Sequence, residues 1–500
     1  MQLLQAMLRN LIFHPFRAAV VDDQRTWKGM HLYFGALHLA RTIERATSRE
    51  HVGIILPTSG LTPMALLATW MLGRTAVPLN YLLKRDDLEY VINDAELDAI
   101  ITVGPMLEVT GELPAPIKTI RLDEVSFKGL PPFRRAAREA DERLAALLYT
   151  SGTSGRPKGV MLTAGNLKAN VRQCIEWVGF DARAVMLGVL PQFHSFGLTV
   201  LTLLPLTIGC KVIYTARFSP RRLLELMKKH QPNVLVAIPS MYNALLSAKS
   251  ATPEHFASIK YLVSGGEALP RAVYDGFMQR FNVAISEGYG LTETAPVTNW
   301  CRPHEHRPGS VGPAVPGVLE RIVDPDGNIL GTDQDGEVRI KGPNIMKGYF
   351  KLPDQTAAVF DDEGFFKTGD MGRIDADGHL RITGRIKEML IIGGENVFPR
   401  EIEEVLDSHP SVHASAVIGV QDESRGEVPI AFVELAEDAS FDERELRSHC
   451  RTHLPQYKVP REIRLRDKLP RNPTGKIVRR ELKADTPSMA QKNPDTPGNE

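Results

Sequence analysis

An α/β fold with a smaller second domain is predicted, because short apolar runs alternate with helical segments as far as Glu287. After about Val311, strand-like runs are separated by Asp-Gly pairs, which is typical of hairpins. Beyond about Arg385, helical stretches again alternate with apolar runs. We expect a large N-terminal domain of helix-covered, mostly parallel sheets with a small antiparallel β region, followed by a small mobile α+β domain.

The first domain's strands are read from continuous apolar runs, as expected where both faces of a parallel sheet are buried. Thr62 is expected to cap a helix with Pro63 at its first position, and residues 86–94 form another helix. Residues 1–13 have helical spacing that favours a helix packed on its own domain over one lying on a membrane. The expected strands are residues 51–56, 99–103, 144–149, 185–190, 211–214, 234–238, 260–263 and 284–287.

Three segments are predicted at the level of domains. Residues 1–384 form the N-terminal domain and residues 385–483 the C-terminal domain. Residues 484–500 are rich in proline and polar residues, so this tail is expected to be disordered. The expected C-terminal elements are helices at 399–408 and 442–453 and strands at 412–420 and 428–435.

The composition excludes several functional classes. Lys plus Arg equals Asp plus Glu at 60 each, so no basic surface indicates a nucleic-acid partner. The four cysteines lie far apart, which favours a reduced, cytoplasmic location. No secretory signal is visible, and the apolar stretch Met64 to Leu72 is too short to span a bilayer. Peripheral membrane contact is left open.

The run TSGTSGRPKG, from Thr150 to Gly159, is suited to binding phosphate. Glycines let the backbone turn tightly near a ligand, and successive N–H groups and hydroxyls offer several donors to one anion. Lys158 adds a positive charge that suits phosphate. The spacing differs from those of the common nucleotide-binding loop and the dinucleotide fingerprint. A flexible surface loop is the alternative interpretation of this run alone.

A second run, EGYGLTET at residues 287–294, follows an expected strand. Tyr289 lies between two glycines, so its ring can rest against a planar group. Thr292 offers a hydroxyl, and Glu293 offers a hard oxygen ligand where Mg²⁺ would bridge protein and phosphate. A turn at the end of the strand is the alternative interpretation of this run, and the presence of the first motif disfavours it.

Three further runs place polar residues in loops. In TGD, Asp370 can accept two hydrogen bonds from a ribose diol, although an Asx turn would also explain these three residues. GRIKEMLIIGGENVFPREIE begins at residue 384 and contains Arg385 and a pair of glycines. RNPTGKIVRREL, from residue 471, contains Lys476, a lysine that would ordinarily be solvated in such a loop.

In this order, the five runs resemble the motifs of the adenylate-forming superfamily, most closely bacterial long-chain fatty acyl-CoA synthetases and acyl-carrier-protein ligases. The resemblance covers residues 150–482, whereas the first 140 residues hold no sharp motif. It implies ATP-dependent activation of a carboxylic acid through an acyl-AMP. ATP and Mg²⁺ are the implied cofactors, and CoA is the implied acceptor.

The resemblance also implies roles for individual residues. Tyr289 stacks on adenine, Asp370 binds the ribose, and Lys476 bridges the substrate carboxylate and the α-phosphate during adenylation. The implied catalytic residues are Thr150, Lys158, His194, Glu293 and Lys476, with Glu293 and Thr153 at the metal. The implied nucleotide, acyl, hinge and pantetheine positions are Thr150, Ser151, Gly152, Thr153, Ser154, Gly155, Lys158, Gly266, Glu267, Ala268, Glu287, Gly288, Tyr289, Gly290, Thr292, Asp370, Arg385, Lys387, Gly393, Gly394 and Lys476.

A medium- or long-chain fatty acid is the expected substrate. The run PQFHSFGLT resembles the segment that faces the acyl carboxylate in fatty-acid and aryl-acid ligases, with His194 near that carboxylate. A structural histidine with one buried partner is the alternative. Amino acids are disfavoured, because no aspartate between Val185 and Lys211 could pair with an ammonium group.

Three alternative functions stay open. One is an acyl-AMP ligase that loads acyl carrier protein, and the second is an aryl-acid–CoA ligase. The third is a nucleotide-binding regulator without catalysis. This last alternative is disfavoured because Glu293, Asp370, Arg385 and Lys476 are all present.

Overall fold

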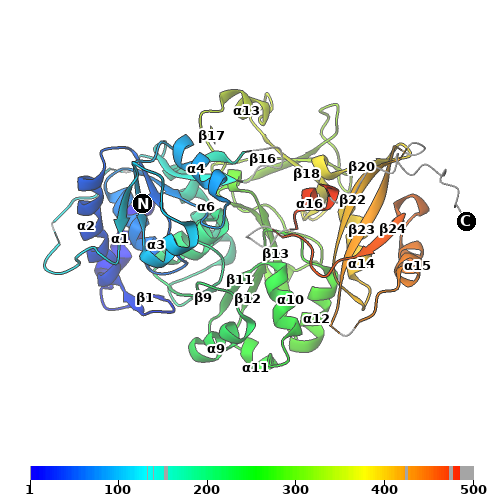
Figure 1. Cartoon of the computed structure of the whole chain (residues 1–500), viewed down its shortest axis with the longest axis horizontal. Coiled ribbons are helices and arrows are strands. Elements are labelled where there is room, and N and C mark those ends of the chain that lie inside the picture. The colour runs from blue at the N-terminus through cyan, green and yellow to red at the C-terminus, as the bar shows by residue number, and fades with distance from the viewer. Residues whose placement is uncertain are drawn as a thin grey trace, which may run out of the picture.

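The computed structural model describes residues 2–131, 133–138, 140–150, 156–422, 426–437, 439–471 and 477–484. Four sheets organise these residues. The two large sheets and their helices occupy the left and centre of Figure 1, and a five-stranded sheet near the C-terminus lies on the right.

The first large sheet has seven strands in the order β17-β8-β7-β4-β3-β5-β6. Its β4, β3, β5 and β6 strands are parallel, as is the pairing of β4 with β7, whereas β8 and β17 join antiparallel. The strands are β3 (His51–Ile54), β4 (Thr75–Pro78), β5 (Ala99–Thr102), β6 (Lys118–Arg121), β7 (Leu144–Thr150), β8 (Lys158–Thr163) and β17 (Gly348–Tyr349).

The second large sheet has eight strands in the order β14-β13-β12-β11-β9-β10-β1-β2. All neighbours are parallel except at the two edges, where β14 and β2 run antiparallel. The strands are β1 (Ala18–Val21), β2 (Thr26–Lys28), β9 (Val185–Gly188), β10 (Lys211–Tyr214), β11 (Val234–Ala237), β12 (Tyr261–Ser264), β13 (Ile285–Gly290) and β14 (Val297–Trp300).

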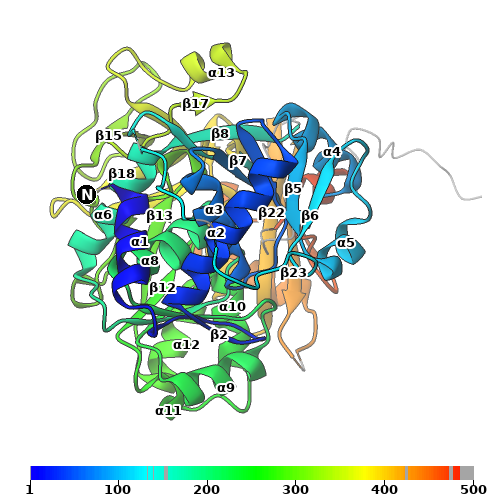
Figure 2. The same cartoon turned by 90° about the vertical axis from the view of Figure 1, so that its left-hand side faces the viewer.

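Helices fill the space between the two large sheets and cover their outer faces. The central core contains α1, α2, α3, α6 and α8, and α1 and α2 face the viewer in Figure 2. Helices α4 and α5 cover the seven-stranded sheet, and α9 to α12 cover the eight-stranded sheet. These helices are α1 (Leu3–Phe13), α2 (Gly29–Ala46), α3 (Leu61–Met71), α4 (Arg85–Asp94), α5 (Gly104–Thr110), α6 (Ala164–Val178), α7 (Ser195–Leu198), α8 (Leu204–Ile208), α9 (Pro220–His230), α10 (Pro239–Ser247), α11 (Pro253–Phe256) and α12 (Arg271–Phe281), with a π-helical turn at Thr199–Leu203.

The remaining sheets are smaller. A four-stranded antiparallel sheet has the order β15-β16-β18-β19. In the last sheet, α14 and α15 pack on one face and α16 on the other. The strands are β15 (Leu319–Val323), β16 (Gly336–Lys341), β18 (Phe366–Ile374), β19 (Leu380–Arg385), β20 (Leu390–Ile392), β21 (Glu395–Val397), β22 (Val412–Asp422), β23 (Gly426–Leu435) and β24 (Glu462–Leu465); the helices are α13 (Pro353–Ala358), α14 (Pro399–Asp407), α15 (Glu443–His453) and α16 (Arg479–Ala484).

The predicted fold class is confirmed, with two differences in detail. The helix expected to begin at Pro63 begins two residues earlier, at Leu61, and Gly60 is its N-cap. The Thr62 hydroxyl instead donates to the carbonyl of Pro57 at 3.2 Å, so it does not cap the helix. The domain boundary at Arg385, which falls at the end of β19, stays a prediction. Within the described part of the chain, no helix combines the length and the apolar character needed to cross a bilayer.

Candidate active site

Several predicted motifs meet at the carboxyl end of the eight-stranded sheet. Parallel strands β12 and β13 end at Ser264 and Gly290, so the loops after them leave the same edge. Thr150, at the end of β7, pairs directly with Lys158 at the start of β8. The two ends of the first motif therefore lie side by side, as a phosphate-binding loop requires. Ser151, Gly152, Thr153, Ser154 and Gly155 lie outside the described residues.

Glu293 and Lys158 lie on either side of one aromatic residue, Tyr349. The Tyr349 hydroxyl donates to Glu293 Oε1 at 2.9 Å, and Lys158 Nζ lies 5.0 Å from the Tyr349 ring centroid. Among the described residues, no group of three or more His, Cys, Asp or Glu side chains could cage a metal ion. Proteins usually hold Mg²⁺ through one or two carboxylates together with substrate phosphates. The single carboxylate of Glu293 therefore fits a metal that arrives with ATP.

Tyr289, Asp370 and Arg385 form a connected group. Tyr289 donates to Asp370 Oδ2 at 2.6 Å, and Arg385 Nε lies 2.7 Å from Asp370 Oδ1. Asp370 and Arg385 face each other in the β18–β19 register, which explains how residues from separate motifs meet. Burial, followed by the Asp370 charge, raises the pKa of Tyr289 well above its usual value, so the phenol stays protonated.

Glu287 connects two loops near this group. Its Oε2 accepts a hydrogen bond from Leu269 N at 3.3 Å, and its Oε1 accepts one from Gly309 N at 3.1 Å. Burial raises the pKa of Glu287 to about 7, although the Arg400 charge opposes this shift. Gly266 adopts φ +87°, which favours glycine, and its Cβ position faces open space apart from Ile238 at 3.7 Å.

His194 begins the segment expected to face the acid. It caps α7, and its Nδ1 accepts a hydrogen bond from Phe196 N at 3.4 Å, which places the ring proton on Nε2. The next residue, Ser195, contacts Thr292 through the two hydroxyl oxygens at 3.3 Å. Thr199 then donates to the carbonyl of Ala295 at 2.9 Å. The structure therefore brings the His194 segment against the loop that carries Thr292 and Glu293.

Buried amides that the sequence analysis missed hold this loop in place. Asn170 exchanges hydrogen bonds with the backbone of Val297 at 2.6 and 3.1 Å, and Asn344 donates to the carbonyl of Thr294 at 2.8 Å. Both asparagines are fully buried. Tyr349 was also missed, because an isolated asparagine or tyrosine has no spacing pattern that marks its role.

The hinge region lies beside the last helix. Lys387 is exposed in the short turn Ile386–Glu388, and Gly393 and Gly394 form the β20–β21 turn with φ of +61° and +90°. Arg479 of α16 pairs with Glu388 at 3.2 Å and with Glu403 at 2.8 Å, and it also interacts electrostatically with Glu267. Figure 1 shows α16 on the side of the C-terminal sheet that faces the rest of the molecule. Lys476 lies outside the described residues.

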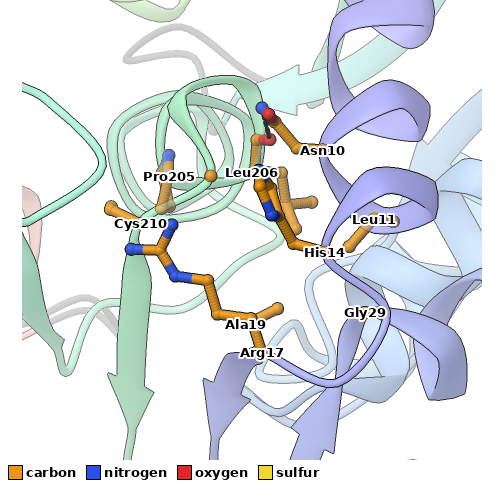
Figure 3. Close-up of a pocket in the computed structure, with 10 residues that line it drawn as sticks. Asn10, Leu11, His14, Arg17, Ala19, Gly29, Pro205, Leu206 and Cys210 are labelled. Carbon is orange, nitrogen blue, oxygen red and sulfur yellow. Dashed lines mark hydrogen bonds between the residues drawn. The ribbon is translucent and has the colours of Figure 1, made fainter.

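Two hollows differ in their relation to this site. A cavity of about 20 Å³ between α1 and the start of β10 is lined by Asn10, His14, Arg17 and Cys210 (Figure 3), and it has room for no more than a water molecule. A larger open hollow of about 590 Å³ lies between α4 and Arg156, at the flank of the phosphate-loop motif.

The fold and the site together point to the class of adenylate-forming enzymes. Residues 12–350 match the AMP-binding enzyme family, and residues 401–476 match the AMP-binding enzyme C-terminal domain. The first match covers more than half of the chain, and the chain therefore belongs to this family. Its activity is that of an ATP-dependent, AMP-forming acid–CoA ligase, and ATP, Mg²⁺ and CoA are the standard requirements of such ligases.

Curated relatives cover most of the chain. A long-chain-fatty-acid–CoA ligase from Bacillus subtilis (strain 168) is 33% identical over 87% of this chain and 85% of its own length. A sulfoacetate–CoA ligase from Cupriavidus necator is 34% identical over 91% and 92%. 4-Coumarate–CoA ligase 3 from Oryza sativa subsp. japonica is 34% identical over 76% and 72%. These relatives are named for different acids, so they do not decide the substrate.

Solved structures share the fold over nearly the whole chain. ATP-bound MatB from Rhodopseudomonas palustris has a TM-score of 0.88 and 31% identity, covering 97% of this chain and 99% of its own. o-Succinylbenzoate CoA synthetase (MenE) from Bacillus subtilis, in complex with ATP and magnesium, has a TM-score of 0.85 and 28% identity, covering 96% and 99%.

Proposed function

We propose that the chain activates a medium- or long-chain fatty acid as an acyl-AMP and transfers the acyl group to CoA. The observation that carries this proposal is the uncharged segment around His194, which would form a wall of the acid site. From Val185 to Cys210 the sequence contains no Asp, Glu, Lys or Arg. The side chains of this segment are predominantly apolar, and those buried in the central core include Leu198, Val200, Leu201, Leu203, Leu204 and Leu206.

An uncharged wall disfavours acids with a second charged group. A buried sulfonate, carboxylate or ammonium without a partner is costly, whereas an alkyl chain gains free energy from burial. This reasoning supports a fatty acid over sulfoacetate or an amino acid. A flat aryl acid would also be accepted by an apolar wall, and we keep it as the second candidate because a 4-coumarate–CoA ligase is among the relatives.

In the proposed adenylation step, the acid's carboxylate attacks the α-phosphorus of ATP and pyrophosphate leaves. The backbone donors of residues 150–155, Lys158 and Lys476 would stabilise the charge that spreads over the phosphates. Glu293, with Thr153, would hold Mg²⁺, which supplies further charge neutralisation when bound. Tyr289 would stack on adenine, and Asp370 would hold the ribose.

In the proposed second step, a thiol attacks the acyl-adenylate and AMP leaves. The C-terminal domain would pivot about Lys387, withdrawing Lys476 and bringing Gly393 and Gly394 to the site. CoA is the proposed acceptor in the cytoplasm. Acyl carrier protein is the alternative partner, and peripheral contact with a membrane that supplies the acid is part of the same proposal.

The test is pyrophosphate release from Mg-ATP with fatty, aryl and dicarboxylic acids and sulfoacetate, each with and without CoA. We expect sustained turnover with medium or long fatty acids only when CoA is present. Sustained turnover only with aryl acids would favour the second candidate. Pyrophosphate release of about one equivalent per enzyme that CoA does not change and acyl carrier protein increases would show that acyl carrier protein, and not CoA, is the acceptor.

A further inference from the structure

Tyr349 contacts two predicted site residues from different segments of the chain. Its hydroxyl donates to Glu293 Oε1 at 2.9 Å, and Lys158 Nζ lies over its ring at 5.0 Å. The side chain is buried, with 7% of its surface exposed. Among the described residues, no second hydrogen-bond donor reaches the Glu293 carboxylate. Tyr349 is therefore in a position to orient both the carboxylate and the ammonium group.

The backbone around Tyr349 is fixed by neighbouring elements. Strand β17 pairs antiparallel with β8, the strand that Lys158 begins. Tyr349 N donates to Thr356 Oγ1 of α13 at 2.9 Å. Met346 N, three residues earlier, donates to the carbonyl of Glu293 at 2.7 Å. The same segment thus binds Glu293 through its main chain and its side chain.

Like the hydroxyls of Tyr149 and Tyr289, which donate to Asp94 and Asp370, the Tyr349 hydroxyl donates to a carboxylate. The hydroxyl of Tyr214 donates to the carbonyl of Leu201, and that of Tyr242 donates to backbone carbonyls, as expected of tyrosines that serve packing. The Glu293 carboxylate that accepts from Tyr349 forms no ion pair among the described residues, whereas the Asp370 carboxylate pairs with Arg385.

We propose that Tyr349 is a positioning residue that holds Glu293 for the metal and Lys158 for the phosphates of ATP. The hydroxyl occupies one carboxylate oxygen and leaves the other for Mg²⁺. The ring face steadies the ammonium group by a cation–π contact. This inference rests on the proposed roles of Glu293 and Lys158, and it adds a residue that links them.

The experiment measures metal binding apart from catalysis. Mn²⁺ is titrated into the full-length protein with saturating α,β-methylene-ATP, and free Mn²⁺ is followed by electron paramagnetic resonance. Y349F removes the hydroxyl and keeps the ring. We expect its Kd for Mn²⁺ to rise about tenfold, the order expected for losing a hydrogen bond to a charged group. In turnover, the KM for Mg²⁺ should rise while the KM for the acid stays unchanged.

A second variant tests the ring. Y349L removes both contacts, so we expect the Kd for the ATP analogue to rise about threefold beyond that of Y349F because the cation–π contact is lost. The thermal unfolding midpoint of each variant, with and without the Mg²⁺–analogue complex, shows whether the protein is folded. A folded Y349F with wild-type Mn²⁺ affinity would overturn the inference.

Tyr261→Phe is the matched control. Tyr261 begins β12, at the end of the strand opposite Ser264, and its hydroxyl donates to the carbonyl of Val178 at 3.4 Å. This variant should keep wild-type Mn²⁺ affinity, and equal losses in Y261F and Y349F would overturn the inference. Failure of the wild type to release pyrophosphate with any acid would overturn the proposed function alone, because the Mn²⁺ titration would still decide the role of Tyr349.

Discussion

At the scale of single residues, Asp370 is a buried charged group that depends on its neighbours. Its side chain is 3% exposed and binds both Tyr289 and Arg385, so its negative charge is held by two partners from other segments. Arg385 is 46% exposed and can be solvated without Asp370. If these residues bind the nucleotide as proposed, we expect a carboxylate so placed to order the tyrosine ring and the arginine before the nucleotide arrives.

Replacing Asp370 by Asn should weaken ATP binding. The amide keeps the shape but loses the charge that orders Tyr289 and Arg385, and we expect the Kd for ATP to rise about tenfold or more. Isothermal titration with α,β-methylene-ATP measures the change. Asp361→Asn is the control, because Asp361, in the turn before β18, pairs with Arg321 of β15 at 2.6 Å and is only 10% exposed. Loss of ATP affinity in the control as well would contradict a specific role for Asp370.

Glu287 should make the stability of the protein depend on pH. Its folded-state pKa is raised from the ordinary 4.5 to about 7, so the unfolded chain releases this proton at lower pH than the folded protein does. Stability is therefore lost as pH rises from about 4.5 to about 7. Glu287→Gln should remove at most about 3 kcal/mol of that pH dependence. Urea unfolding at pH 5 and pH 8 tests this, and identical pH slopes for both proteins would contradict it.

At the scale of elements, the first helix is part of the core. Leu3, Leu4, Met7 and Leu11 of α1 are buried, which agrees with a helix packed on its own domain. Its exposed positions are the polar Gln5 and Arg9 and the last two residues, Ile12 and Phe13. The helical spacing predicted an apolar face, but it could not specify which surface would cover that face.

Met7→Ala should destabilise the protein. Met7 is completely buried in the central core, and its truncation leaves a cavity that costs about 3 kcal/mol. Phe13→Ala at the exposed end of the same helix should change the free energy of unfolding by less than about 0.5 kcal/mol. Urea denaturation compares the two variants. A small effect at Met7 together with lost vesicle binding would show that α1 serves a membrane instead.

Helix α3, which follows β3, shows that a local sequence signal can be overridden by a nearby contact. Thr62 before Pro63 was expected to be an N-cap, but the helix begins at Leu61 and Thr62 lies within its first turn. The Thr62 hydroxyl is drawn to the Pro57 carbonyl in the preceding loop. A contact with that loop thus competes with capping, and the sequence pattern does not reveal which one prevails.

At the scale of the whole molecule, the two half-reactions should depend on different residues. Lys476→Ala should reduce adenylation by about a hundredfold or more, because a charge that stabilises the transition state is removed. Thioester formation from supplied acyl-AMP should be much less affected. Separate assays of pyrophosphate release and acyl-CoA formation measure both steps. Lys483→Ala, at an exposed position in α16, is the control, and equal loss of both steps in Lys476→Ala would contradict this division.

The sequence alone determined the fold class, the family and the order of the motifs. Parallel strands buried on both faces leave continuous apolar runs, and glycine-rich phosphate loops need particular residues at close spacing, so both signals are local. Only the tertiary structure decided that Tyr349 contacts both Lys158 and Glu293, and that Asn170 and Asn344 hold the backbone of Val297 and Thr294 just after Glu293. These contacts join residues at least 50 positions apart, and a single sequence carries no local pattern for such pairs.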